Sequence, residues 1–336
     1  TDDGYLLKLY DLSDLSDDGI EVIQPTLSAD SQYELTGDKL MMANATVIYV
    51  VDIAQPGEVL YQKSINDVDH AELCFTGSEY VLMTLSNGEL SAERLTGGLI
   101  DLGISNENIV YVKCEGSDYA FLVDGQRDKV FISNLEVTGS LSYTVNASAS
   151  EEDELALDDW GTPTDLDNLT ITDLVFDRSH MLVTVNVTSV DRIVLIDRTT
   201  GEQLLLGNGK YSSYDPSIRD GVIAWVMKDF LDPSNPIEEY YDGEIMYMYL
   251  SDNFTHVLTA DQIDQWGPIV LEDHLIYLEE SNDGVVIKVH SWTPELKSYS
   301  NIVLQVASVV GIIIVFIYIN QKQSEAKPAL VIQEEE

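Results

Sequence analysis

The residues best suited to metal chemistry lie near the start of the chain. Asp14, Ser16 and Asp18 alternate and are followed by Gly19. Alternate oxygen ligands followed by a glycine are typical of a calcium-binding loop, where the oxygens converge on one ion. The twelfth position, where such a loop places its last carboxylate, is occupied by Pro25. The segment is therefore a calcium candidate, with a simple hairpin turn as the preferred alternative.

No catalytic constellation is found. The chain lacks an H-E-x-x-H motif, a G-x-S-x-G elbow and a glycine-rich phosphate loop. Acidic pairs occur throughout, so none is informative as an acid/base pair. The five histidines are scattered along the sequence: His70, His180, His256, His274 and His290. We therefore predict a protein that is not an enzyme and that uses no cofactor other than the candidate calcium ion.

Two long polar segments carry side chains that suit a protein interface. Residues 148–168 hold eight acids and no base, and residues 228–243 are rich in aromatic residues. The candidate interaction residues are Asp158, Asp159, Trp160, Phe230, Tyr240 and Tyr241. The alternative is that both segments are solvated loops without a partner.

Five Asn-x-Ser/Thr sequons are candidate glycosylation sites on an exported surface. Their asparagines are Asn44, Asn146, Asn168, Asn186 and Asn253.

The elements that position these residues are repeats. The stretch YDPSIRDGVIAWVM (214–227) recurs 52 residues later as WGPIVLEDHLIYLE (266–279). Fainter copies precede it, and the spacings between their turns are 40, 39, 61, 43 and 52 residues. Subtracting the 21 residues of segment 148–168 from the spacing of 61 restores 40. The turns lie near Gly37, Gly77, Gly116, Asp177, Asp220 and Glu272.

Each repeat contains two pairs of short strands. The apolar stretches are β-branched and aromatic, alternate in polarity, and are bounded by Gly, Asp, Asn and Ser. Four strands in about 40–45 residues are typical of one β-propeller blade. Residues 5–24 resemble the second half of a repeat, and six repeats follow. We therefore predict an all-β fold, a β-propeller of seven blades whose first blade is incomplete in this chain, with six-bladed closure as the alternative.

The strand order predicts that both long segments share one face of the ring. Segment 148–168 joins the outer strand of one blade to the inner strand of the next, and segment 228–243 joins a second strand to a third. These two kinds of connection emerge on the same side of a propeller.

The two cysteines, Cys74 and Cys114, occupy equivalent places in adjacent repeats and form no C-x-x-C motif. A disulfide requires Cα atoms within about 7 Å. Because inner strands of neighbouring blades are often farther apart, we expect two buried thiols rather than a bridge.

Residues 192–278 resemble TolB-type (WD40-like) propeller repeats, which occur in proteins of the bacterial periplasm and the archaeal cell surface. The resemblance rests on Pro216, the turn Asp220-Gly221, Trp225 and the stretch 245–250, and covers about a quarter of the chain. It implies a propeller fold and an interaction role, while partners vary within the family.

The end of the chain predicts a membrane anchor. Residues 302–319 contain no charge and would span roughly 27 Å as a helix, close to the thickness of a bilayer. We assign residues 1–299 to a propeller ectodomain, 301–320 to a transmembrane helix and 321–336 to a short tail. Lys322 and Lys327 follow the helix, which favours a cytoplasmic tail and an ectodomain outside the cell.

The net charge is −42, from 59 acids against 17 Lys and Arg. Such a surface repels nucleic acid and suits a saline exterior. We therefore predict a membrane-anchored, extracytoplasmic propeller that binds a protein or ligand at the cell surface. One alternative is a structural subunit of a cell-envelope or membrane complex, assembled through its transmembrane helix. Another is an enzyme with a site in the central channel.

Overall fold

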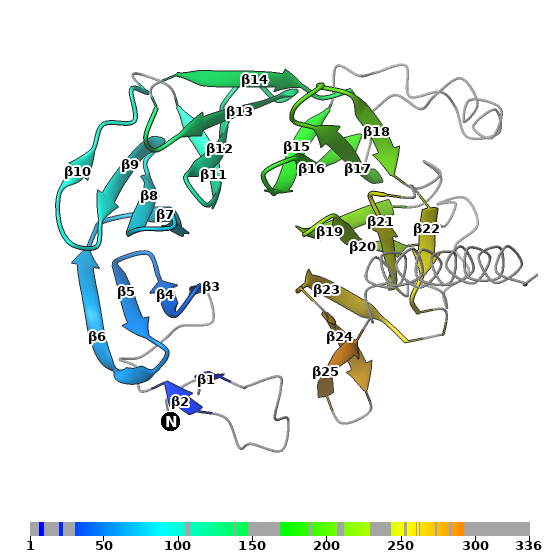
Figure 1. Cartoon of the computed structure of the whole chain (residues 1–336), viewed down its shortest axis with the longest axis horizontal. Helices are drawn as coiled ribbons and strands as arrows, with labels where there is room; N and C mark the ends of the chain where they lie inside the picture. Colours follow the sequence, from blue (N-terminus) through cyan, green and yellow to red (C-terminus); the bar gives the residue numbers. More distant parts are fainter. Residues whose placement is uncertain are drawn as a thin grey trace, which may run out of the picture.

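The described part of the chain is entirely β-sheet. The computed structural model describes residues 7–9, 20–22, 31–104, 108–137, 139–146, 169–187, 190–206, 212–228, 243–251, 254–259, 261, 263–272, 274–281 and 284–291. Its sheets follow one another around a common axis in the order of the sequence, each with its first strand at the inside (Figure 1).

Sheets 1 to 3 are antiparallel and four-stranded. Sheet 1 contains β3 (Gln32–Thr36), β4 (Lys39–Ala43), β5 (Val47–Asp52) and β6 (Gln55–Ser64). Sheet 2 contains β7 (Val68–Phe75), β8 (Tyr80–Ser86), β9 (Glu89–Arg94) and β10 (Leu99–Ile100). Sheet 3 contains β11 (Ile109–Glu115), β12 (Asp118–Val123), β13 (Lys129–Asn134) and β14 (Ser140–Thr144).

Sheets 4 and 5 are built in the same way, while sheet 6 has three described strands. Sheet 4 contains β15 (Thr170–Phe176), β16 (His180–Val187), β17 (Val190–Asp197) and β18 (Gln203–Leu206). Sheet 5 contains β19 (Ser212–Arg219), β20 (Val222–Lys228), β21 (Gly243–Tyr249) and β22 (Phe254–Val257). Sheet 6 contains β23 (Gln265–Val270), β24 (His274–Ser281) and β25 (Gly284–Ser291).

A separate two-stranded sheet precedes these six. Its strands β1 (Leu7–Leu9) and β2 (Ile20–Val22) pair antiparallel, with Leu7 opposite Val22. It corresponds to the half repeat expected at the start of the chain. The described order is thus a half sheet followed by six sheets, and closure into seven blades stays a prediction.

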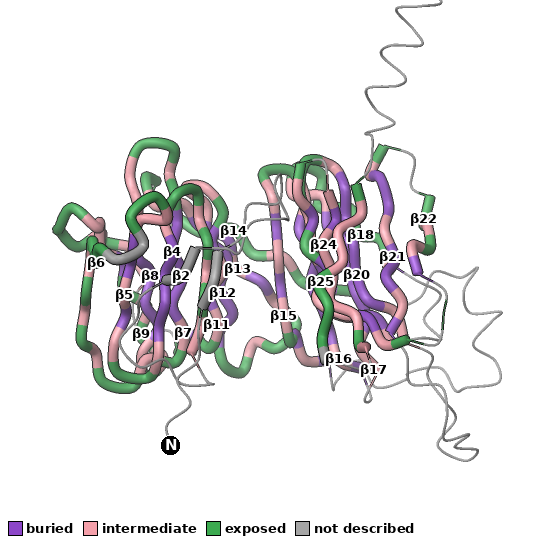
Figure 2. Tube along the Cα trace, turned by 90° about the horizontal axis from the view of Figure 1, so that it is seen from below, coloured by how far each residue is buried: buried purple, intermediate pink, exposed green. Residues whose placement is uncertain are grey.

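The hydrophobic core lies between the sheets. Buried side chains form a separate cluster at each of the five junctions between consecutive sheets 1 to 6. At the junction of sheets 4 and 5, for example, Leu182 and Ile193 pack with Trp225. In Figure 2 the buried positions gather on the inner and middle strands, and the exposed ones at turns and outer strands.

This packing explains why the second strands of sheets 2 to 5 read as continuous apolar runs. A strand covered on both faces has no solvated side to alternate with. Strand β8 is buried over Val81–Leu85 and β20 over Val222–Val226. Strand β24 is buried at Leu275 but only partly buried along most of its length, because sheet 6 is the last described sheet and no described sheet packs on its far face. Ile269 and Ile287 on that face are 54% and 58% exposed.

The described residues contain no helix long and apolar enough to cross a bilayer. The helix predicted at residues 301–320 and the tail at 321–336 lie outside the described residues, so this assignment stays a prediction.

Candidate functional site

The inner strands of sheets 1 to 4 carry polar side chains where a buried junction would normally be apolar. Side chains of a strand alternate between its two faces, so residues two apart share one face. We call the set that meets at the inside of the ring the inner-strand cluster. Its members are Gln32 and Glu34 on β3, His70 and Glu72 on β7, Tyr111 and Lys113 on β11, and Asp173 on β15.

Side chains of β3 bind the backbone of β7. Glu34 Oε2 accepts the N–H of Leu73 at 2.7 Å, and Gln32 Oε1 accepts the N–H of Ala71 at 3.0 Å. Thr36 donates its hydroxyl to the Leu73 carbonyl at 2.8 Å. Strands β3 and β7 belong to different sheets and form no backbone ladder with each other. The side chains of β3 therefore supply the hydrogen-bond partners that the backbone groups of Ala71 and Leu73 need.

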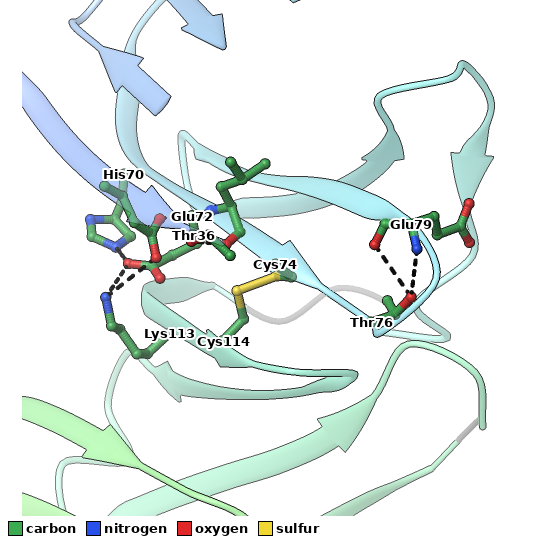
Figure 3. The surroundings of a disulfide bond; sticks show 10 residues. Thr36, His70, Glu72, Cys74, Thr76, Glu79, Lys113 and Cys114 are labelled. Atoms are coloured by element: carbon green, nitrogen blue, oxygen red, sulfur yellow. Dashed lines mark hydrogen bonds and ion pairs between the residues drawn. A yellow bond between two sulfur atoms is a disulfide. The ribbon is translucent and has the colours of Figure 1, made fainter. Parts of the chain in front are cut away.

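Glu72 is the centre of the cluster. Its side chain is 3% exposed, and its Oε1 accepts hydrogen bonds from His70 Nε2 at 2.8 Å and Lys113 Nζ at 3.0 Å (Figure 3). Gln32 Nε2 lies 3.3 Å from His70 Nδ1. Because the amide nitrogen can only donate, this contact selects the tautomer in which Nδ1 accepts and Nε2–H donates to Glu72.

Glu34 and Glu72, two of the three carboxyl groups in the cluster, differ in protonation. Burial first, and the charge of Glu72 second, raise the pKa of Glu34 to about 8. Burial opposes ionisation of Glu72 as well, but hydrogen bonding to His70 and the charge of Lys113 leave its pKa below the usual range. Glu34 therefore carries a proton at neutral pH while Glu72 is ionised.

This proton explains an otherwise unsatisfied atom. Glu72 Oε2 is buried and has no hydrogen-bond partner among the described residues. The side chain of Glu34 is close enough to that of Glu72 for the charge of Glu72 to raise the pKa of Glu34. A protonated Glu34 can donate to Glu72, so the pair holds one negative charge opposite Lys113.

The cluster continues into sheet 4. Tyr111 donates its hydroxyl to Asp173 Oδ1 at 3.0 Å, and its ring lies 5.2 Å from that of His70. Burial raises the pKa of Tyr111 well above its ordinary value, which keeps it a neutral donor. On its other side, Gln32 lines a cavity of about 350 Å³ together with Asn44, Thr46 and Asp69. The cluster thus reaches a surface cavity through Gln32.

Chemically, this arrangement stiffens the junctions between the inner strands. Its acids and bases are engaged with one another, and the described residues contain no group of three or more His, Cys, Asp or Glu that could hold a metal ion. Sequence reasoning missed the cluster because carboxylates and histidines are scattered along the chain. The available signal was the alternation of polar residues on inner strands, at Gln32/Glu34, His70/Glu72 and Tyr111/Lys113.

The expectation of two free thiols was wrong. Cys74 and Cys114 form a disulfide between β7 and β11, with Cα atoms 5.8 Å apart (Figure 3). Inner strands converge toward the axis, and at this level they are close enough for the bridge. Each cysteine is close in sequence to a cluster residue, Glu72 or Lys113, so the disulfide and the ion pair hold the same junction.

The predicted interaction residues at positions 158–160, 230, 240 and 241 lie outside the described residues. The strand ends that flank their segments are described. In antiparallel sheets, the start of a first strand and the end of a second lie on the same side. Thr170 begins β15 and Lys228 ends β20, so both long connections leave from one face of the ring, as the strand order predicted.

The calcium candidate, Asp14, Ser16 and Asp18, also lies outside the described residues. The antiparallel pairing of β1 with β2 shows that this segment joins the two strands of a hairpin. A calcium ion there stays a prediction.

Three sequon asparagines are described. Asn146 is exposed, whereas Asn44 and Asn186 are partly buried. The Asn44 Oδ1 accepts three hydrogen bonds from Thr46 and Val47, and Asn186 Nδ2 donates to Asp191 at 2.8 Å. Asn146 is thus the most accessible of the three. Asn168 and Asn253 lie outside the described residues.

No protein-family model matches the chain, and no curated protein matches it. Solved structures are similar in fold. The β-propeller domain of the Trilobed protease from Pyrococcus furiosus, reported to have an open velcro topology, superposes with a TM-score of 0.51 at 12% identity, over 82% of this chain and 83% of that one. A candidate TolB from Agrobacterium tumefaciens superposes with a TM-score of 0.43 at 12% identity, over 70% of this chain and 80% of that one. BamB from Moraxella catarrhalis superposes with a TM-score of 0.44 at 14% identity, over 78% of this chain and 70% of that one.

The first of these similarities shows a β-propeller fold. The β-propeller fold that the TolB-type resemblance implied is therefore confirmed, and at these identities the similarity shows the fold alone.

Proposed function

We propose that this chain is an interaction module, a propeller anchored at the cell surface that binds a protein partner through the face carrying the two long connections. The observation that supports it is the unequal length of the connections on that face. Strand β6 ends at Ser64 and β7 begins at Val68, whereas β14 ends at Thr144 and β15 begins at Thr170. Loops that vary on a constant scaffold are the usual location of binding.

The described sheets are held together at each junction. The junction of sheets 2 and 3 is held by the Cys74–Cys114 disulfide and the Glu72–Lys113 ion pair, and every junction of sheets 1 to 6 has its own buried core. A rigid support reduces the entropy lost when a loop binds.

Charge indicates the chemistry of the partner. With a net charge of −42, the molecule repels acidic proteins and attracts basic ones. We propose a partner with a cationic surface, whose association rate falls as salt is added.

The disulfide supports an extracytoplasmic location, because disulfides persist mainly in oxidising compartments. We propose that residues 301–320 span the membrane and that the tail 321–336 faces the cytoplasm. A protease added to intact cells should then remove the ectodomain and leave an epitope on the tail protected. Cleavage of the tail in intact cells would contradict this orientation.

The interaction is tested by truncating its aromatic side chains in the full-length protein. The quadruple variant Trp160→Ala, Phe230→Ala, Tyr240→Ala, Tyr241→Ala should lose the proteins cross-linked to the wild type in membranes. The matched control is Phe75→Ala, an exposed aromatic residue on the opposite face, which should keep them. Equal recovery from wild type and quadruple variant would reject this face as the binding surface.

A second candidate is a structural subunit assembled through residues 302–319. Its supporting observation is the small-xxx-small pair Ala307 and Gly311, which permits close approach of two helices. Scrambling this segment at constant hydrophobicity distinguishes the two proposals. Loss of assembly with the quadruple variant still assembled would favour the helix.

A further inference from the structure

Cations are scarce in this chain, and most of the described ones are paired. Seven lie within 3.5 Å of a carboxylate: Lys39, Lys63, Arg94, Lys113, Arg198, Lys228 and Lys288. Arg178 makes no ion pair within the described residues. Arg219 approaches only its neighbour Asp220, at 3.7 Å, with both side chains largely exposed. Where acids are so abundant, two guanidinium groups at one place, neither within 3.5 Å of a carboxylate among the described residues, call for an explanation.

Both arginines line the same cavity, of about 610 Å³. The cavity lies where the inner strands β11, β15, β19 and β23 end, on the face opposite the long connections. Its lining also includes Glu115, Ser179 and Val270. This volume is within the range of small-molecule sites, about 300–1,000 Å³.

The turns that carry the arginines are well defined. Asp177 Oδ1 accepts the N–H groups of Ser179 and His180, each at 2.8 Å, which fixes the turn around Arg178. Asp220 and Gly221 have positive φ angles of 50° and 80°, the backbone of a tight hairpin immediately after Arg219.

The acids of the cavity compete weakly with an incoming anion. Burial raises the pKa of Glu115 against the opposing effect of Arg219 and Arg178. Asp177 already accepts the hydrogen bonds of its own turn. Asp220 is largely exposed. Two guanidinium groups therefore line the cavity together with the carboxyl groups of Glu115, Asp177 and Asp220.

We propose that this cavity binds a small organic anion through carboxylate or phosphate oxygens. Guanidinium groups bind both in a bidentate manner. Ile218 and Val270 provide apolar contact for the rest of such a molecule, which favours an organic anion over a bare inorganic one. The site is separate from the loop face, and the two proposals can fail independently.

The test is calorimetric titration of the detergent-solubilised full-length protein with sodium succinate, phenyl phosphate and inorganic phosphate at constant ionic strength. We expect saturable binding of at least one organic probe, tighter than inorganic phosphate. The double variant Arg178→Ala, Arg219→Ala should weaken it at least about tenfold. The control Arg94→Ala removes a cation that is paired with Glu79, and should leave affinity unchanged.

A second variant should increase the affinity for the anion, which a purely structural role of Glu115 would not produce. Glu115→Gln removes the competing carboxylate while keeping its shape, and should tighten binding several-fold. The measurement on Glu115→Gln still tests the proposal if the double alanine variant fails to fold. Equal affinity in wild type, double variant and Glu115→Gln, or no saturable binding of either organic probe to the wild type, would overturn the proposal. Loss of partner binding in the loop-face variant with anion affinity intact would separate the two sites.

Discussion

Glu72 is a buried charge that is stabilised by its partners. Its carboxylate is buried between sheets, and its two hydrogen-bond partners, His70 and Lys113, lie on β7 and β11 rather than on one strand. A buried charge without a partner is strongly destabilising, whereas a paired one is close to neutral. The cluster therefore depends on Lys113, the nearest cation to both Glu72 and Glu34.

Replacing Lys113 should be costly. We expect Lys113→Met to lower the free energy of unfolding by about 3–5 kcal/mol, because Glu72 would stay buried without its cation. The control is Lys63→Met, which breaks the more exposed pair with Glu93 and should cost no more than about 1 kcal/mol. Urea denaturation at pH 7 measures both, and similar losses would contradict the special role of the buried pair.

Glu34 makes stability depend on pH in the opposite sense to most carboxyls. Its pKa in the folded protein is raised to about 8, so its contribution is complete below the unfolded pKa near 4.5 and is lost as pH rises through 8. Relative to Glu34→Gln, the wild type should lose on the order of 2–4 kcal/mol between pH 4.5 and 9.

Denaturation of both proteins across this range measures the difference. The glutamine keeps an acceptor for the Leu73 N–H and a donor toward Glu72. Parallel pH profiles would show that Glu34 titrates normally in the folded state.

Strands were the most predictable elements. The runs around Val81–Leu85 and Val222–Val226 are strands because β-branched and aromatic residues between turn residues have little alternative. The alternation of polar residues at His70 and Glu72 was visible in the sequence too. The sequence of one strand, however, does not show which of its faces packs against the next sheet. The disulfide was mispredicted for the same reason, since the distance between β7 and β11 is set by how the sheets converge.

Removing the disulfide should destabilise the junction of sheets 2 and 3. The bridge closes a loop of 40 residues, and its loss should cost about 4 kcal/mol in the chain-entropy description. We expect the Cys74→Ala, Cys114→Ala variant to unfold at lower urea concentration than the oxidised wild type. Dithiothreitol should lower the urea midpoint of the wild type toward that of the variant and leave the variant's midpoint unchanged. A wild-type midpoint that does not respond to the reductant, even when it is added to the unfolded protein, would argue against a bridge in solution.

At the scale of the molecule, repulsion between acids opposes folding. With a net charge of −42, raising NaCl from 0.1 to 1 M shortens the screening length from about 10 to 3 Å and should increase the denaturation midpoint. Sucrose at matched osmolality controls for water activity. A midpoint that rises equally with sucrose and salt would show that charge repulsion is not the cause.

The amino-acid sequence by itself determined the repeat, the strands, the acidic charge and the places where connections lengthen. These properties are local, because turn residues and the alternation of apolar residues act over a few positions. Only the tertiary structure decided that Glu34, Glu72 and Lys113 meet, that Cys74 reaches Cys114, and that Arg178 and Arg219 border one cavity. Successive partners are about 40 residues apart and lie in different sheets. Their contacts follow from the convergence of inner strands on a common axis, a distance that no local pattern encodes.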